Sequence, residues 1–195
     1  DSMEALFAQS TGLKVVMPST AYDAKGLLLE AIRDPDPVIF FEPLRGYRLT
    51  RDEVPATDYT VPFGKLRVVR EGTDVTLVTW SASVPVAEAA AEQLAAEGIS
   101  VHLIDLRTLV PLDEEGLVEA VERTGRCVVL HEGPATAGFG AEVIALLQDQ
   151  AFYSLEAPMV RVTAPDIPYP MPGVEHFYIP DASKVVRAVH SVLMD

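Results

Sequence analysis

The amino-acid sequence predicts an α/β protein whose mostly parallel sheet is covered by helices on both faces. From Lys65 onward, strand-like apolar runs alternate with helix-like segments. Such alternation requires crossover connections, which produce parallel strands. Apolar residues make up 49% of the 195 residues, enough for a sizeable core and against a disordered chain. Three regions separate by pattern: residues 1–48, residues 49–64 and residues 65–195.

The first region predicts a single strand–helix–strand unit. Thr20 and Asp23 are placed as the two ends of a capping box, in which the hydroxyl and the carboxylate satisfy free amides at a helix start. The helix that follows has one apolar stripe and ends at the Asp-Pro-Asp-Pro segment of residues 34–37. Flanking strands are expected at residues 13–17 and 38–41, the second of them buried.

The second region predicts an extended linker, because its prolines and Gly64 interrupt any periodic pattern. In the third region, residues 66–70 form a first short strand that turns at Glu71-Gly72 into the next one. The other expected elements are strands at 75–80, 101–106, 127–130 and 160–163, a helix at 84–97, a helix capped by Asp113 and closed by Gly125, a helix lined by Val143, Ile144 and Leu147, and a final helix capped by Asp181.

The charge balance limits the classes of partner. A net charge of −14 argues against a nucleic-acid or anionic-membrane surface, both of which need basic patches. It is interpreted first as a source of solubility and, alternatively, as a docking surface for a basic partner. No apolar run approaches the roughly 20 residues that cross a bilayer. The start of the sequence lacks the features of a signal peptide, so the chain is expected to be cytoplasmic.

Several polar segments follow the predicted strands, where ligands usually lie in open α/β sheets. They are Ser81-Ala82-Ser83, Asp105-Leu106-Arg107-Thr108 and His131-Glu132-Gly133. His131 and Glu132 have the composition of an acid–base pair, but such neighbours more often order their own loop, which is the interpretation favoured. The Gly138-Phe139-Gly140 segment can hold a phosphate at a helix start or simply allow a tight turn. Cys127 lies in an apolar run and is expected to be a core residue.

Oxygen-rich groups gather at the end of the first predicted helix. A helix carboxyl end leaves up to four carbonyls unpaired and carries a partial negative charge. Asp34 and Asp36 add carboxylates, which makes a cluster suited to a hard cation. From the spacing alone, an ordinary proline stop with the aspartates in water is the favoured interpretation.

Six segments carry a family resemblance in their order and spacing. They are PSTAYDAKGLL at residues 18–28, FEP at 41–43 with YR at 47–48, DVTLV at 74–78, IDLRTLVP at 104–111, HEGP at 131–134 and GFGAE at 138–142. Together they resemble the β subunits of pyruvate and branched-chain 2-oxo-acid dehydrogenases, of the transketolase superfamily. The resemblance covers essentially all 195 residues.

This resemblance implies a division of the chain and a reaction. Residues 1–48 would be the tail of a pyrimidine-binding domain, residues 49–64 a linker, and residues 65–195 a transketolase-type carboxy-terminal domain. Such enzymes are α2β2 tetramers that use thiamine diphosphate and magnesium to decarboxylate a 2-oxo acid. They pass the acyl group to a lipoyl arm of the dihydrolipoyl acyltransferase core. The expected partners are therefore an α subunit, a second β subunit and that acyltransferase.

The same resemblance places the catalytic groups outside these residues. In the family, the glutamate that protonates the cofactor and a neighbouring histidine precede the position of Asp1, and the diphosphate and magnesium ligands belong to the α subunit. No catalytic or cofactor-binding residue is therefore predicted in this chain, which we expect to be inactive alone. Ala31, Ile32, Asp34 and Asp36 match a structural potassium site of these β subunits, whose other ligands would also lie outside.

Two other readings stay open at this point. The first is the carboxy-terminal part of a transketolase or deoxyxylulose-phosphate synthase, because residues 104–108 fit several of these enzymes. The HEGP and GFG segments fit the dehydrogenase β subunit better. The second is a stand-alone α/β assembly module without an active site, which a native start near Asp1 would support.

Overall fold

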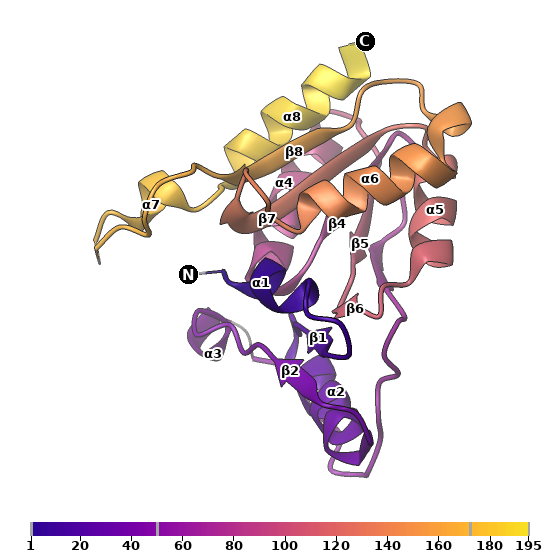
Figure 1. Ribbon diagram of the computed structural model, residues 1–195. Helices are drawn as coiled ribbons and strands as arrows, with labels where there is room; N and C mark the ends of the chain where they lie inside the picture. The colour runs from indigo at the N-terminus through magenta and orange to yellow at the C-terminus, as the bar shows by residue number, and fades with distance from the viewer. Residues whose placement is uncertain (1, 50, 172, 195) are drawn as a thin grey trace.

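The computed structural model describes residues 2–49, 51–171 and 173–194 (Figure 1). The strands in these ranges are β1 Lys14–Val16, β2 Val38–Phe40, β3 Arg67–Arg70, β4 Val75–Thr79, β5 Val101–Asp105, β6 Thr108–Val110, β7 Cys127–Pro134 and β8 Val160–Ala164. The α-helices are α1 Glu4–Ala8, α2 Ala21–Arg33, α3 Gly46–Leu49, α4 Val84–Ala96, α5 Glu114–Glu122, α6 Gly140–Gln150, α7 Glu175–Tyr178 and α8 Ala182–Met194, with 3₁₀ turns at Ser81–Ser83 and Phe152–Ser154.

The larger sheet has the strand order β3-β5-β4-β7-β8. Strands β5, β4, β7 and β8 are parallel, and β3 joins the edge antiparallel to β5. Helices α4 and α8 cover one face and α5 and α6 the other (Figure 1). Leu77 and Val78, neighbours in β4, are both fully buried, one in each of the two core clusters. The prediction of a mostly parallel sheet with helices on both faces is therefore confirmed.

The smaller sheet has the order β2-β1-β6. Strands β1 and β2 are parallel and are connected through α2, which confirms the predicted strand–helix–strand unit. Strand β6 comes from the third region and pairs antiparallel with β1. The two regions are therefore joined by strand pairing as well as by the linker. The expectation that β2 is buried is wrong, because its three residues are half-buried at the sheet edge.

Side-chain caps begin three of the helices as predicted. The backbone N–H of Asp23 donates to Thr20 Oγ1 at 3.0 Å. Asp113 caps α5, and Asp181 accepts from the Lys184 backbone at 2.8 Å at the start of α8. One part of the capping-box prediction is wrong: the Asp23 carboxylate turns away from the helix start and meets Arg107 instead.

Strand β3 does not form a hairpin with β4, contrary to the expected turn from one strand into the next. It pairs with β5, because both edges of β4 are taken, by β5 and by β7. The connection crosses the start of β5 so closely that a Cβ at Gly72 would lie 2.1 Å from the Val101 carbonyl carbon. Only glycine permits this approach.

Four short elements were absent from the sequence-based prediction: α1, α3, β6 and α7. Their five, four, three and four residues are too few for a periodic pattern to be recognised. In the ranges that the structure describes, every helix is too short or too polar to cross a bilayer.

Candidate functional site

The carboxyl ends of β4, β5 and β7 meet at one edge of the larger sheet, as parallel strands require. The three polar segments predicted from the sequence lie there, although β7 extends to Pro134 and so contains His131-Glu132-Gly133 rather than ending before it. The edge is not open, because the first region lies across it (Figure 1). Glu4 of α1 contributes to one contact with this edge, and Ser19 and Asp23 to a second.

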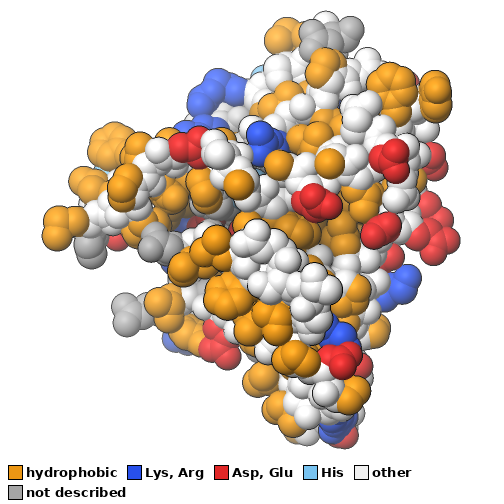
Figure 2. All heavy atoms as spheres, in the orientation of Figure 1, with side chains coloured by type: hydrophobic (Ala, Val, Ile, Leu, Met, Phe, Trp, Pro, Cys, Tyr) orange, Lys and Arg blue, Asp and Glu red, His pale blue; other side chains and the backbone are white. Residues whose placement is uncertain are grey.

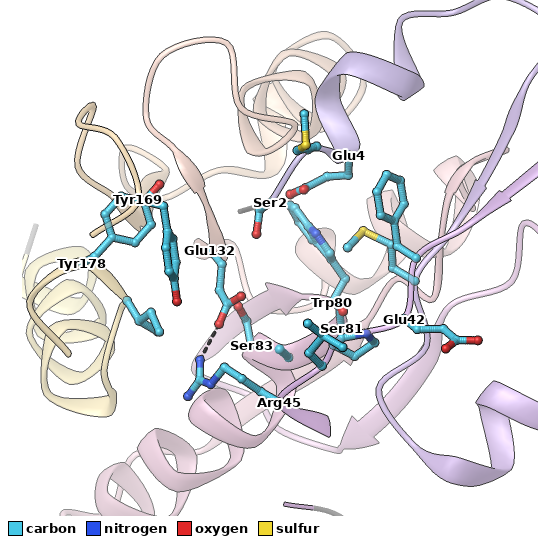
Figure 3. Close-up of a pocket in the computed structure, with 17 residues that line it drawn as sticks. Ser2, Glu4, Glu42, Arg45, Trp80, Ser81, Ser83, Glu132, Tyr169 and Tyr178 are labelled. Atoms are coloured by element: carbon cyan, nitrogen blue, oxygen red, sulfur yellow. Dashed lines mark hydrogen bonds and ion pairs between the residues drawn. The ribbon is translucent and has the colours of Figure 1, made fainter. Parts of the chain in front are cut away.

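Beside α1 lies a cavity of about 350 Å³ (Figure 3). Its walls come from the start of the chain, the β2–α3 loop, the 3₁₀ turn after β4, the end of β7 and the segment around α7. The Arg45 guanidinium and the Glu132 carboxylate form an ion pair of 2.5 Å within it. Figure 3 shows Tyr169 and Tyr178 on one side of this pair and Trp80 on the other. The cavity is thus polar at its centre and aromatic at its sides.

His131 lies behind this cavity rather than in it. Its ring stacks on Trp80 with centroids 5.1 Å apart, and Phe139 meets the same indole edge-on at 5.8 Å. The His131 side chain is buried, and among the described residues neither ring nitrogen has a hydrogen-bond partner. Burial, and then the charge of Arg161, lowers the pKa of His131 to about 4. The imidazole is therefore neutral at physiological pH.

The two interpretations of the His131–Glu132 pair are both wrong. The side chains alternate along β7, so Glu132 faces the cavity and Arg45 while His131 faces the core. They therefore form no acid–base pair. Nor does His131 order its own loop through hydrogen bonds, since its nitrogens have none in the described part of the chain.

The glycines of the Gly138-Phe139-Gly140 segment are explained by contact with His131. A Cβ at Gly140 would lie 2.6 Å from His131 Nε2, and one at Gly138 would lie 2.3 Å from the Pro134 carbonyl oxygen and 2.7 Å from His131 Cε1. These residues let the chain turn tightly over the imidazole into α6, which begins at Gly140. Packing thus accounts for the glycines without a bound phosphate.

Glu4 is the residue of this edge that sequence reasoning missed. Its side chain is only 2% exposed and interacts with the Trp80 indole, while its Oε2 has no hydrogen-bond partner among the described residues. Burial is the main cause that raises the pKa of Glu4. Nothing in the sequence marks this glutamate, since it stands in a five-residue helix without a recognisable motif.

A second buried polar cluster joins the regions on the other side of β1. The Ser19 hydroxyl donates to Asp105 Oδ2 at 2.5 Å, and Arg67 Nη2 lies 3.3 Å from the same oxygen. Arg107 Nη2 lies 2.8 Å from Asp23 Oδ1, and Arg67 Nε 3.4 Å from Asp23 Oδ2. These last two are ion pairs rather than aligned hydrogen bonds, because neither Asp23 oxygen meets hydrogen-bond geometry. Burial raises the pKa of Asp105, opposed by the Ser19 hydrogen bond and the Arg67 charge.

Arg107 takes its place in this cluster through an unusual backbone. Its φ of +58° lies in the left-handed region, which residues with a Cβ seldom adopt. Its carbonyl accepts from the Met17 backbone at 2.8 Å, and its own N–H donates to Asp105 Oδ1 at 3.1 Å. The turn after β5 is therefore shaped by contact with the first region.

The residues predicted to hold potassium lie at the far end of α2, away from the cavity (Figure 1). Lys14 Nζ is 2.7 Å from the Asp34 carboxylate and 3.1 Å from that of Asp36. The hydrogen bond from Lys14 is the first cause that lowers the pKa of Asp34. Ile32 is 72% exposed and Ala31 is half-buried. Both carboxylates thus have an ammonium partner, and the described residues contain no cluster of three or more His, Cys, Asp or Glu suited to a metal ion.

Cys127 is buried in the core cluster beneath α5 and α6, as predicted. Burial raises the pKa of its thiol to about 12, so the reactive thiolate is not formed at neutral pH. This excludes a nucleophilic role for the residue in the folded chain.

Two family models match the chain. The model described as "Transketolase, C-terminal domain" matches residues 64–185, and that described as "Transketolase, pyrimidine binding domain" matches residues 2–50. The "Pyruvate dehydrogenase E1 component subunit beta" of Bacillus subtilis (strain 168) is 47% identical over 193 residues, covering 99% of this chain and 59% of the relative. The "2-oxoisovalerate dehydrogenase subunit beta" of the same organism is 46% identical, covering 98% of the chain and 59% of the relative.

A solved structure shares the whole described fold. It is titled "Split gene transketolase, inactive beta4 tetramer", and it superposes with a TM-score of 0.79 at 28% identity over 98% of this chain and 60% of its own. The chain thus spans 59% of the length of the curated relatives named above. The matched model over residues 64–185 covers more than half of the sequence, and the structure agrees with it. The chain belongs to the transketolase C-terminal domain family.

Proposed function

We propose that this chain is the β-subunit part of a decarboxylating component of a 2-oxo-acid dehydrogenase complex. The observation that carries the proposal is a sequence identity of 46–47% to β subunits of that kind, over nearly the whole chain. The split-gene transketolase is only 28% identical, which favours the dehydrogenase over the transketolase alternative. The pyruvate and 2-oxoisovalerate relatives are equally similar, so the proposed substrate class is a 2-oxo acid.

In this proposal thiamine diphosphate and magnesium are held by residues outside the chain, and the chain alone does not catalyse. Two features support this. The polar groups at the sheet edge are engaged with one another, as Asp105 is with Ser19 and Arg67. The buried His131 faces the core rather than the cavity. The match of residues 2–50 to a pyrimidine-binding domain supports thiamine diphosphate as the cofactor of the complete enzyme.

The test compares the pure 195-residue chain with a complete β subunit of this family produced together with its α subunit. Both are assayed for thiamine-dependent decarboxylation of pyruvate and of 2-oxoisovalerate. We expect turnover only from the complete pair. Decarboxylation by the chain alone would contradict the proposal, as would a complete pair that processes sugar phosphates but neither 2-oxo acid.

A second β subunit is the proposed partner of an exposed apolar arm. The arm comprises the described residues of 166–178 and projects from the body of the molecule (Figures 1 and 2). Met171 is 81% exposed and Phe177 is 74% exposed. Apolar side chains exposed this far commonly mark an interface. The β4 tetramer named for the solved relative supports a contact between like subunits.

Sedimentation across a range of concentrations tests this contact. We expect the chain to associate, and Phe177→Asp to remain monomeric because a carboxylate cannot be buried unpaired in an apolar interface. Tyr153→Asp is the matched control, since Tyr153 is 99% exposed on a different part of the surface. If both variants associate like the original chain, the arm is not the interface.

We propose that the acyltransferase binds an acidic face of the chain, separate from the apolar arm. Red side chains gather over α5 at the right of Figure 2. This helix carries Glu114, Glu115, Glu119 and Glu122. Complementary charge accelerates and orients docking of a basic partner. The subunit-binding domain of the cognate acyltransferase should bind at low salt and less tightly at high salt, because exposed charges are screened beyond about 8 Å at physiological ionic strength. Binding that is insensitive to salt would reject an electrostatic dock.

We propose that the complete subunit binds potassium at the end of α2, where the Lys14 ammonium group pairs with the two aspartates in this chain. Lys14 meets the Asp34 and Asp36 side chains, so a potassium ion would depend on backbone oxygens near Ala31 and Ile32 and on ligands outside the chain. Thermal unfolding of the complete subunit in potassium and in tetramethylammonium is the test. We expect higher stability in potassium, and equal stability would reject the site.

A further inference from the structure

Helix α1 borders two cavities and packs against the core cluster of the domain through Ala5, Phe7 and Ala8. Ser2, Met3 and Glu4 line the cavity of about 350 Å³. Ala5 and Ala8 line a second cavity of about 610 Å³ on the other side. An edge-on ring contact between Phe7 and Phe41, with centroids 5.5 Å apart, is its main aromatic contact in the described structure. The helix also makes one buried polar contact with this edge.

That polar contact is made by Glu4, and the side chains that the structure describes offer it no positive partner. No described basic side chain acts on its charge, and its Oε2 has no hydrogen-bond partner among the described residues. Hydrogen bonds from the Glu4 backbone and from the Trp80 indole at the end of β4 favour the carboxylate, but burial outweighs them and raises the pKa of Glu4. A carboxylate buried without a cation is costly, whereas the neutral acid is far less so.

The charged and titratable groups around Glu4 do not supply the missing charge. Strand β7 presents the Glu132 carboxylate and the neutral His131 ring, and α7 presents the Tyr178 phenol. Arg45 is paired with Glu132, and the effect of Arg161 in β8 falls on His131.

We propose that Glu4 is a proton-controlled latch: the uncharged acid holds α1 against Trp80 and His131, and the carboxylate releases it. Release exposes the stacked Trp80–His131 pair. This gives the edge a closed form and an open form governed by one proton. The proposal concerns the folded chain and does not depend on the reaction of the complete enzyme.

The direction of the pH dependence follows from the two buried groups. The pKa of Glu4 is raised by burial, so docking of α1 is strongest below its ordinary value of 4.5 and weakens as pH rises through the window up to the raised value. Within that window each pH unit favours the open form by up to about tenfold. His131 acts oppositely: its pKa of about 4 against an ordinary 6.5 means that docking weakens as pH falls through this interval.

A Glu4→Gln variant separates the titration of Glu4 from that of His131. The glutamine side chain has nearly the same shape as that of glutamic acid, but it does not titrate. Trp80 is the single tryptophan of the chain, so its fluorescence reports directly on the latch. Amide hydrogen exchange of α1, divided by the intrinsic rate, gives the opening equilibrium from about pH 4 to about pH 8. Glu92→Gln, on an exposed position of α4, is the control for the same change of charge.

We expect the ratio of the opening equilibrium in the original chain to that in Glu4→Gln to rise with pH, by up to about tenfold per unit over the Glu4 window. The Glu92→Gln variant should follow the original chain at every pH. A ratio that is independent of pH overturns the proposal. If Glu4→Gln does not fold, the original chain decides alone: opening of α1, read from Trp80 emission and α1 exchange, that only falls as pH rises is the direction His131 alone gives, and it would also overturn the proposal.

Discussion

The two regions of the molecule are stabilised in different ways. In the carboxy-terminal domain, apolar side chains fill both faces of the larger sheet, and Leu103 and Ile104 of β5 are fully buried on opposite sides. The first region shares with the linker a cluster of only three buried residues, Val16, Leu27 and the linker residue Val61. Its helix α2 leaves Ile32 largely exposed.

The first region depends on the domain for its remaining contacts. Val15 and Met17 of this region extend one of the domain's core clusters, and β1 pairs with β6. Asp23 and Glu4 add the polar contacts described above. We infer that the core of the carboxy-terminal domain is sufficient to stabilise that domain, whereas the first region depends on its contacts with the domain. We therefore expect substitutions in the two regions to differ in what they unfold as well as in size.

The largest difference is expected from one substitution made in both regions. Leu103→Ala should lower the free energy of global unfolding by about 3–5 kcal/mol, because it leaves a cavity in a closed core. Leu27 is equally buried, yet Leu27→Ala should destabilise the first region and leave the unfolding of β4, β5 and β7 nearly unchanged. Denaturant unfolding with hydrogen exchange as readout distinguishes the two. Equal global losses would contradict the separation of the regions.

A smaller effect is expected at the ionic contact between the regions. Asp23→Asn leaves Arg107 beside a neutral amide and should weaken docking of the first region by about 3 kcal/mol, as for a broken buried ion pair. A double-mutant cycle with Arg107→Gln measures the coupling. A coupling near zero would mean that the pair is compensated by water and does not hold the regions together.

The smallest effect is expected at the helix caps. Thr20→Ala removes the acceptor of the Asp23 N–H and should cost about 1 kcal/mol, confined to the first region. Asp181→Ala removes the corresponding acceptor of the Lys184 N–H in α8 and should cost about the same, but in global unfolding. Identical unfolding behaviour of the two variants would count against the comparison.

Local patterns in the sequence predicted most of the domain and part of the first region. Thr20 was recognised because a cap lies within one helical turn of its target. The buried strands were recognised because runs such as Cys127-Val128-Val129-Leu130 are apolar throughout, as in a sheet covered on both faces.

Contacts between distant segments account for what the sequence did not predict. Asp23 has a helix-capping position in the sequence, but in the fold its carboxylate forms an ion pair with Arg107 instead. The stack of Trp80 on His131 joins the ends of two different strands, and Glu4 reaches it from a helix too short to be recognised. The residues of the candidate site therefore come together only in the folded chain, and no sequence motif connects them.

We infer that the carboxy-terminal domain is stable by itself and that the first region depends on it. Native-state hydrogen exchange along the whole chain tests this inference. Amides of β4, β5 and β7 should exchange only through global unfolding, with a free energy that falls with denaturant along the global slope. Amides of β1, β2 and α2 should exchange through a smaller opening, several kcal/mol lower in free energy and less sensitive to denaturant. Equal free energies and equal denaturant slopes in both regions would contradict the account.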